Sequence, residues 1–536
     1  MTAPARILTQ TQVHGLRSAG RRGAPSAVAL GALSLVLFLT FLDNTIVSVV
    51  LADVQSSLHA GVGALQWVVN GYALAFASLM LTFGTLGDLV GRTRVMLSGV
   101  AVFCAGSVLC AVAPDVSFLV AGRVVMGVGA AASEPGTLSM IRHLYRHEGE
   151  RARALGVWVA VSGLALALGP VVGGALAGVW SWRAIFWFNL LFGLLAFAVS
   201  VYVLPENADP SRRHFDLRGA GLVASALAAL SFAIISGETA GYRTVWIALL
   251  FVLSAASVVV FVRRERRAEY PVLDVSFFRR RPFLGSNVVA FSTYFSVFAV
   301  FFFVALYLQV VGSNTPDGTA IDFIPMAAAM ILSSSLTGRL VARFGPRLPM
   351  TVGSLVATAG LLLTEELLGP HVGVSTLGWT LSLTGLGFGM ALVPTTTAAL
   401  AAIPAKHSGM AASMTNTSRE FGAVLGVAVL GSVVNGQLTT NLVRRLAALG
   451  IPASFRSEVV TAVTTGTVGG RAAQAAKNPA IASIVHRVVT AAYGAFSHGL
   501  DLSLFIASAL MLAGAVTAAV TMPTGSHSAS AHARRR

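Results

Sequence analysis

A polar segment, Gly84-Thr-Leu-Gly-Asp-Leu-Val-Gly-Arg-Thr-Arg94, separates two apolar runs that are each long enough to cross a lipid bilayer. A related segment, Gly338-Arg-Leu-Val-Ala-Arg-Phe-Gly-Pro-Arg347, recurs about 250 residues later, again between two apolar runs. One polar segment of this kind indicates only a hinge or loop. Because each copy follows the second apolar run of its half, the pair indicates an internally repeated membrane protein.

The composition also places the chain in a bilayer. Of the 536 residues, 55% are apolar and 11% are charged, whereas soluble domains have about 25% charged residues. The 54 glycines suit membrane helices that pack through small side chains. The formal charge of +16 is scattered between apolar runs, so it indicates membrane topology and argues against nucleic-acid binding. Cys104 and Cys110 share one apolar run and are expected to be core residues, not a disulfide or metal pair.

Fourteen apolar runs of about 20 residues are predicted to cross the membrane. The first run is about 23 residues long and lacks a small-residue cleavage site, so we expect a retained span and not a signal peptide. An even number of spans places both tails on one side. The approximate spans are 28–50, 66–87, 95–113, 117–140, 154–177, 184–204, 217–236, 244–262, 283–310, 320–338, 349–367, 377–400, 410–434 and 499–521.

Basic residues alternate between the two sides as the positive-inside rule requires. Segments assigned to the cytoplasm carry 27 of the 37 Arg and Lys residues, and the short outer loops carry two, Arg183 and Arg243. The remaining eight lie in the long outer segment 435–498 and within spans. We therefore predict that both termini are cytoplasmic.

These spans divide the chain into two bundles with an insertion. The predicted parts are a cytoplasmic tail (1–27), an N-terminal six-helix bundle (28–204), a linker with spans 7 and 8 (205–281), a C-terminal bundle (282–521) and a cytoplasmic tail (522–536). The outer segment 435–498 is expected to form a structured hairpin or surface helices, or to be partly disordered. Seven arginines in 263–281 suit a membrane-surface anchor.

Several motifs beyond the polar segments carry a family resemblance. The chain resembles the major facilitator superfamily, and within it the fourteen-span drug:proton antiporter branch. The resemblance implies an all-α integral membrane protein, with two six-helix bundles that rock between inward-open and outward-open states and two inserted helices. Besides the segment at Gly84, it rests on Phe41–Val47, Arg123–Ala131, Leu168–Gly174, Ser181–Arg183 and Asn416–Gly422.

Asp43 and Arg123 are the leading candidates for proton coupling. A carboxylate deep inside a span costs about 2.5 to 3.5 kcal/mol, so such residues usually face a cavity and mark an ion pathway. Spans 1 and 4 place both residues at similar depth, close enough to interact. We hypothesise that Arg123 favours the ionised form of Asp43 until substrate or a conformational change separates them and the carboxylate takes a proton. The alternative is a static ion pair that locks two helices.

Glu134 follows Arg123 by 11 residues, which places it about 20° round the helix and about 16 Å deeper, facing the same lumen. It could be a second proton site, an attraction for cationic substrates, or a cap near a helix end before Pro135. In span 13, Asn416 and Arg419 match the family motif. Glu420 is about 100° from Arg419 and is expected to face a neighbouring helix or the cytoplasmic rim.

Glycines in span 5 recur four residues apart around a proline, which favours close packing and a bend. They match the family's antiporter motif and favour export, although a merely well-packed span is an alternative. The motif residues are Gly169, Pro170, Gly173 and Gly174.

The polar segments are predicted to form a cytoplasmic gate. Asp88 can accept hydrogen bonds from a helix N-terminus or an arginine across the interface. The family usually has arginine directly after this aspartate, whereas here Leu89 stands there, so Arg92 and Arg94 are left to carry the charge. The gate residues are Gly84, Asp88, Gly91 and Arg92 in the first half and Gly338, Arg343, Gly345 and Arg347 in the second.

Together these features predict a proton-coupled exporter of small amphipathic, drug-like molecules in a bacterial cytoplasmic membrane. Its partners would be a small-molecule substrate, protons and the bilayer, and it would function as a monomer. Neither lysine lies in a phosphate-binding loop, so we expect no cofactor beyond the proton gradient. The alternative is export of one metabolite, siderophore or natural product. His143 and His147 are four residues apart in a basic loop, and neither a metal site nor enzyme activity is expected.

Overall fold

A computed structural model describes residues 26–145, 147–206, 217–267, 275–311, 314–368, 374–404, 408–453, 456, 460 and 479–523. This part of the chain is helical throughout, with short connections and no strand. Each of the fourteen predicted spans falls largely on one or more helices. The helices are α2 (Ser26–Ile46), η1 (Ser48–Val50), α3 (Leu51–Leu58), α4 (Val62–Val90), α5 (Arg92–Ala111), α6 (Val116–Leu144), α7 (Glu148–Val179), α8 (Ala184–Val203), α9 (Leu217–Ala240), α10 (Val245–Glu265), η2 (Val275–Arg279), α11 (Arg281–Ala299), η3 (Val300–Val304), α12 (Ala305–Val310), α13 (Pro316–Phe344), α14 (Arg347–Leu367), α15 (Val374–Ala401), α16 (Ser408–Ala448) and α19 (Pro479–Thr521).

Length and apolar character support the membrane assignment. In the described residues, twelve helices are long and apolar enough to cross a bilayer, and α9 contains a shorter apolar helix, Gly221–Gly237. Span 1 corresponds to α2 and η1 and stops before α3, and span 9 corresponds to α11, η3 and α12, where η3 is a π-helical turn. The helix α4 is not among the twelve. The number fourteen is consistent with the structure and stays a prediction.

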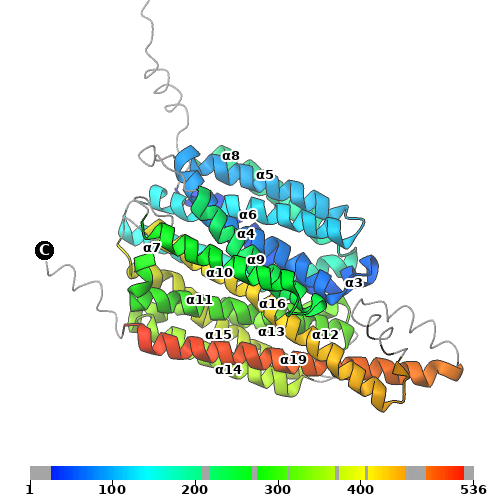
Figure 1. The fold of residues 1–536 in the computed structure, drawn as a ribbon. Helices are drawn as coiled ribbons and strands as arrows, with labels where there is room; N and C mark the ends of the chain where they lie inside the picture. Colours follow the sequence, from blue (N-terminus) through cyan, green and yellow to red (C-terminus); the bar gives the residue numbers. More distant parts are fainter. Residues whose placement is uncertain are drawn as a thin grey trace, which may run out of the picture.

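The helices form two bundles with α9 and α10 between them. In Figure 1, α4, α5, α6 and α8 lie on one side of α9 and α10, and α11, α13, α14, α15 and α19 lie on the other. The two inserted helices pack on each other, and α9 also packs on α4 of the first bundle and α16 of the second. The bundles meet mainly where α7 packs on α13 and α4 packs on α16.

Both polar segments turn out to be helix ends rather than loops. The first continues α4 as far as Val90, and Gly91 alone, at φ +123°, separates it from α5. In the second, α13 runs to Phe344, and Gly345 (φ +79°) and Pro346 precede α14. The polar residues continue the hydrogen bonding of the helix, so each hinge is shorter than the polar segment. A glycine of positive φ then suffices to reverse the chain.

Both ends of the outer segment 435–498 continue membrane helices. The helix α16 runs on to Ala448 and α19 begins at Pro479, so the predicted spans 410–434 and 499–521 are too short. Figure 1 shows both helices reaching past the ends of the others. They pack on each other there, since a Cβ on Gly494 would lie 2.8 Å from Arg445 Nη1. Residues 461–478 and the predicted tails up to residue 25 and from 524 lie outside the described residues.

Candidate functional site

Asp43 and Arg123 are in direct contact inside the first bundle, as predicted. Arg123 Nη1 lies 2.5 Å from Asp43 Oδ2, and both side chains are almost completely buried. Asp43 lies in the last turn of α2, and Arg123 lies two turns into α6. The pair therefore joins two helices of one bundle, and its charges cancel within the membrane core.

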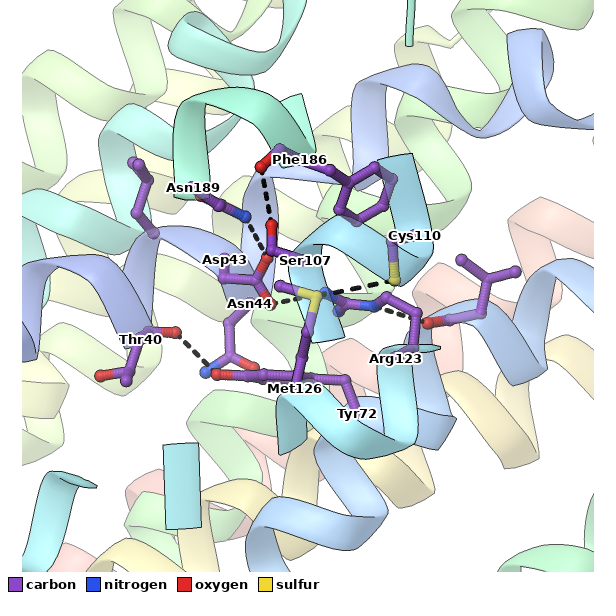
Figure 2. A network of polar contacts seen from close by, with 12 residues as sticks. Thr40, Asp43, Asn44, Tyr72, Ser107, Cys110, Arg123, Met126, Phe186 and Asn189 are labelled. Atoms are coloured by element: carbon purple, nitrogen blue, oxygen red, sulfur yellow. Dashed lines mark hydrogen bonds and ion pairs between the residues drawn. The ribbon is translucent and has the colours of Figure 1, made fainter. Parts of the chain in front are cut away.

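Further groups surround this pair, and Figure 2 shows Asn189, Tyr72 and Thr40 among them. Asn189 Nδ2, from α8, donates to the other Asp43 oxygen, Oδ1, at 2.6 Å. Arg123 Nε donates to the Val68 carbonyl oxygen at 3.0 Å, and its guanidinium lies 4.4 Å from the centroid of the Tyr72 ring. The Tyr72 hydroxyl in turn donates to the Thr40 carbonyl oxygen. Each of these partners comes from the first bundle, so none of these contacts depends on the second bundle.

Sequence reasoning missed Asn189. The signal was available, because this residue is the single Asn or Gln in the apolar helix α8. A buried amide in lipid must satisfy its polar atoms on a neighbouring helix. The intramembrane carboxylate of Asp43 was the obvious acceptor.

Glu134 links the two bundles. Its Oε1 accepts a hydrogen bond from Asn416 Nδ2, on α16, at 2.7 Å, and its side chain is 1% exposed. The interpretation of Glu134 as a helix cap was wrong, because α6 continues through Pro135 to Leu144. The two remaining interpretations, a proton site or an attraction for cations, both fit a buried carboxylate at this position.

Arg419 and Glu420 point in different directions, as their angular separation predicts. Arg419 Nη2 donates to the hydroxyls of Thr395 and Thr396 at 2.8 and 2.6 Å, so its charge is solvated by α15. Glu420 Oε1 accepts from Asn44 Nδ2, on α2, at 3.5 Å. Glu420 therefore makes a second polar contact between the bundles and does not lie at the rim.

The glycines of α7 occupy two different interfaces. A Cβ on Gly169 would lie 2.9 Å from Ile46 N, and one on Gly173 would lie 3.0 Å from the Ile46 Cγ1 atom, so this face packs on α2. On the other face, a Cβ on Gly174 would lie 2.5 Å from the Pro316 carbonyl oxygen at the start of α13. One helix thus packs backbone to backbone against both bundles, with Pro170 inside it.

The gate residues are not brought together as one cluster. Gly84 lies against Pro135 of α6 and Ser413 of α16, whereas a Cβ on Gly338 would meet nothing within 4 Å. The α4–α5 junction is covered by the residues that follow α8, because a Cβ on Gly91 would meet the Glu206 carboxylate and Arg94 Nε lies 3.4 Å from Glu206 Oε2. The charge of Arg94 is therefore bound within its own bundle.

The remaining gate residues differ in exposure. The Asp88 side chain lies outside the described residues, and Arg92 is partly buried. The guanidinium of Arg343 is exposed and lies 5.2 Å from the Phe344 ring, and Arg347 opens α14. The structure thus shows two similar junctions with dissimilar surroundings.

Aromatic side chains of α4 and α11 lie beside the buried arginines and beside the inserted helix α9. Tyr294 lies 5.9 Å from the Arg419 guanidinium and stacks on Phe298. Trp67 packs on Phe232 of the inserted helix α9. Both cysteines are buried and free, so the prediction of core residues is confirmed. Within the described residues, no group of His, Cys, Asp and Glu could hold a metal ion.

Comparison with a family model decides the classification. The model described as Major Facilitator Superfamily matches residues 33–427. The chain belongs to this superfamily. It is 35% identical over 415 residues to the multidrug resistance protein Stp of Mycobacterium tuberculosis, with 77% of each chain covered. It is 30% identical to the tetracenomycin C resistance and export protein of Streptomyces glaucescens over 94% of this chain and 93% of that protein.

Other comparisons agree with the superfamily fold. The multidrug efflux pump LfrA of Mycolicibacterium smegmatis is 29% identical over 95% of this chain and 99% of its own length. Among solved structures, a bacterial homologue of the lysosomal transporter Spinster, inward-facing and occupied, matches with a TM-score of 0.60, 18% identity, and 92% and 97% coverage. The superfamily member described here is therefore a multi-pass membrane transporter and not an enzyme.

Proposed function

We propose that this protein exports small amphipathic, drug-like compounds across a bacterial cytoplasmic membrane in exchange for protons. Relatives that cover most of its length are named as multidrug resistance and antibiotic export proteins. We further propose that it acts as a monomer, with both termini in the cytoplasm and with the proton gradient as its energy source. The proposal on energy coupling rests on one observation, the buried Asp43–Arg123 ion pair.

The pair can couple protonation to conformation because it has no access to water while it is closed. Breaking a buried ion pair leaves an uncompensated charge at a cost of about 3 to 5 kcal/mol. If Arg123 moves away from Asp43, binding of a proton to the carboxylate removes the part of that cost that falls on Asp43. The Asn189 amide stays hydrogen-bonded to either form, because its carbonyl oxygen can accept from a protonated carboxyl. Protonation would therefore stabilise the conformation in which the pair is open.

Alternating access would use the interface of α7 with α13. Backbone atoms of the two helices touch at Gly174 and Pro316, so the bundles can slide or rock without rearranging large side chains. The inserted helix α9 packs on both bundles and would move with this rearrangement. The two gate junctions would open and close the cytoplasmic side.

The test is transport in proteoliposomes with an imposed pH gradient. The purified protein should drive uptake of amphipathic dyes into vesicles with an acidic lumen, when the cytoplasmic face is outward. Asp43→Asn should abolish gradient-driven transport and leave downhill exchange of dye measurable. The control is Asp53→Asn, which alters a carboxylate of the adjacent helix α3 outside the ion pair. Full gradient-driven transport by Asp43→Asn would overturn the proposed coupling.

A panel of substrates separates broad from narrow specificity. Two of the relatives are named for one antibiotic each, tetracenomycin C and methylenomycin A. Gradient-driven movement of many unrelated dyes and drugs is expected for multidrug export. Movement of one compound class alone would instead favour export of a defined natural product.

A further inference from the structure

The helices α16 and α19 are too long for the bilayer and extend beyond it as a pair. They contain 41 and 43 residues, whereas no other described helix has more than 32. At 1.5 Å per residue each is about 60 Å long, twice the thickness of the hydrocarbon core. Figure 1 shows both helices reaching past the others at the same end. We call residues 435–448 of α16 and 479–498 of α19 the outer arm.

The outer arm has an apolar seam of its own. Leu438, Leu442 and Leu446 recur every four residues along α16, and all three are buried. On α19, Ala491 and Ala495 are buried in the same apolar cluster. Because this seam continues outside the bundles, the two helices remain packed on each other beyond the membrane. The arm is therefore a stiff support for the side chains on its surface.

The surface of the outer arm is basic. The outer segment 435–498 contains six Arg and Lys residues and a single acidic residue, Glu458. Arg444, Arg445 and Arg487 are exposed, and none of the three forms an ion pair with another described residue. The described residues of the arm include no Asp or Glu. Nothing within the described arm thus balances its positive charge.

The arginines stand above the lipid headgroups. A Cβ on Gly499 would lie 2.8 Å from the Val434 carbonyl oxygen, so these two residues pair where the predicted spans end. Arg445 and Arg487 are eleven and twelve residues further out, which is about 16 to 18 Å along the helices. The headgroup region is about 5 to 8 Å thick on each side, and charges are screened over about 8 Å. The arm therefore presents its charge to molecules outside the bilayer.

The arm lacks the apolar side chains by which a folded protein would bind it. Val443 is the one exposed large apolar residue in the described arm, and its other exposed neighbours are threonine and alanine. Protein interfaces are centred on aromatic and large apolar anchors. A flexible polyanion needs only spaced cations, and the guanidinium of arginine binds phosphate and carboxylate groups through two hydrogen bonds.

We propose that the outer arm binds a flexible anionic polymer of the cell surface through phosphate or carboxylate groups along the polymer chain. This inference goes beyond export and takes from the proposed function only the orientation of the chain. Arg444 and Arg445 point about 100° apart on α16, and Arg487 adds a third cation nearer the end of the arm. A flexible chain can contact all three, whereas a flat rigid surface would reach only some of them.

The test is binding of fluorescently labelled polyphosphate and polyglutamate to the full-length protein in proteoliposomes of uncharged phosphatidylcholine. Vesicles that expose a C-terminal tag are removed first, so that the arm faces outward. The triple variant with Arg444→Gln, Arg445→Gln and Arg487→Gln should bind at least one polymer about three- to hundredfold more weakly, as for three exposed ion pairs. Wild-type binding should weaken steeply with salt, and the triple variant should show a shallower salt dependence.

Matched variants separate a site on the arm from a general effect of charge. Arg243→Gln removes an exposed arginine of the outer face that is not on the arm, and it should bind like the wild type. Lysine at all three arm positions keeps the charge and should recover part of the binding. Equal binding by the wild type and the triple variant would overturn the inference. Equal losses from Arg243→Gln and from each single arm variant would also overturn it.

Two further measurements distinguish this inference from its alternatives. Displacement of the polymer by phosphatidylglycerol vesicles at equal phosphate concentration would indicate a lipid surface and would overturn the inference. Dye transport measured without polymer should be unchanged in the triple variant, because the exposed arginines lie outside the bundles. Failure of proton-coupled export by the wild type would overturn only the proposed function and would leave polymer binding intact.

Discussion

At the scale of single residues, the first bundle contains a charge pair whose every polar neighbour is defined. Asp43 receives donors from Arg123 and Asn189, and Arg123 also contacts the Val68 carbonyl, the Tyr72 ring and the Met126 sulfur. Lysine could not reproduce these contacts, because it lacks the planar fork of donors. The pair was predictable because an ionised side chain in lipid needs a partner at its own depth. The Glu134–Asn416 contact was not predictable, because the sequence alone does not show how one bundle packs against the other.

A double-mutant cycle on this pair separates stability from coupling. Asp43→Asn and Arg123→Met are each expected to lower the apparent melting temperature, since each leaves a buried charge unpaired at about 3 to 5 kcal/mol. The double variant should recover most of that loss, because neither charge remains. Thermal unfolding in detergent measures the change in stability, and transport in proteoliposomes measures the change in coupling. Recovery of transport together with stability would mean that the pair is only a structural lock.

At the scale of elements, α7 has two faces that contain glycine, and each face packs on a different bundle. Gly169 and Gly173 pack on α2 of the same bundle, whereas Gly174 packs on α13 of the other. The spacing of the glycines predicted close packing, but it could not say which neighbour each face would meet. The ends of α4 and α16 were not predicted for a related reason. The polar residues there lack the apolar periodicity by which a membrane helix is recognised in a sequence. Only the glycine of positive φ marks where α4 stops.

Alanine substitutions along α7 should give different defects at its two interfaces. Gly169→Ala places a Cβ against the backbone of α2 and should lower thermal stability by about 1 to 3 kcal/mol, as for overpacking of a core. Gly174→Ala wedges the bundles apart at Pro316 and should reduce transport at least as strongly as stability. Transport rates and melting temperatures of the purified variants provide the comparison.

The same helix offers a matched control for these variants. A Cβ on Gly156 would meet nothing within 4 Å, so Gly156→Ala should leave both properties unchanged or raise stability slightly through better helix propensity. Equal defects in all three variants would indicate that α7 tolerates no substitution. The two-interface interpretation would then be wrong.

At the scale of the whole molecule, the bundles are joined by contacts of two kinds. Polar contacts at Glu134 and Glu420 are specific and few, whereas the α7–α13 interface is made of small side chains and backbone. Near Val49, the end of η1 also accepts a hydrogen bond from Gln309 of α12. Transport by rocking bundles requires that some of these contacts separate in every cycle. A covalent bond across the α7–α13 interface should then stop the cycle.

Gly163 and Ser334 provide the position for such a bond. A Cβ on residue 163 would lie 3.9 Å from Ser334 Cβ, within the range of about 3.5 to 4.5 Å that a disulfide spans. In a background with Cys104 and Cys110 replaced by alanine, Gly163→Cys with Ser334→Cys should cross-link under copper phenanthroline and lose transport. A reductant should restore transport.

Two controls make this result interpretable. Each single cysteine variant should transport under oxidant, and Gly156→Cys with Ser334→Cys should not cross-link, because residue 156 faces open space. Fluorescence of a bound dye can report whether the cross-linked protein still takes up substrate. We expect binding without release, since the substrate contacts persist while the bundles are held together. Undiminished transport by fully cross-linked protein would show that α7 and α13 stay fixed during the cycle, and the movement between conformations would then have to occur within each bundle.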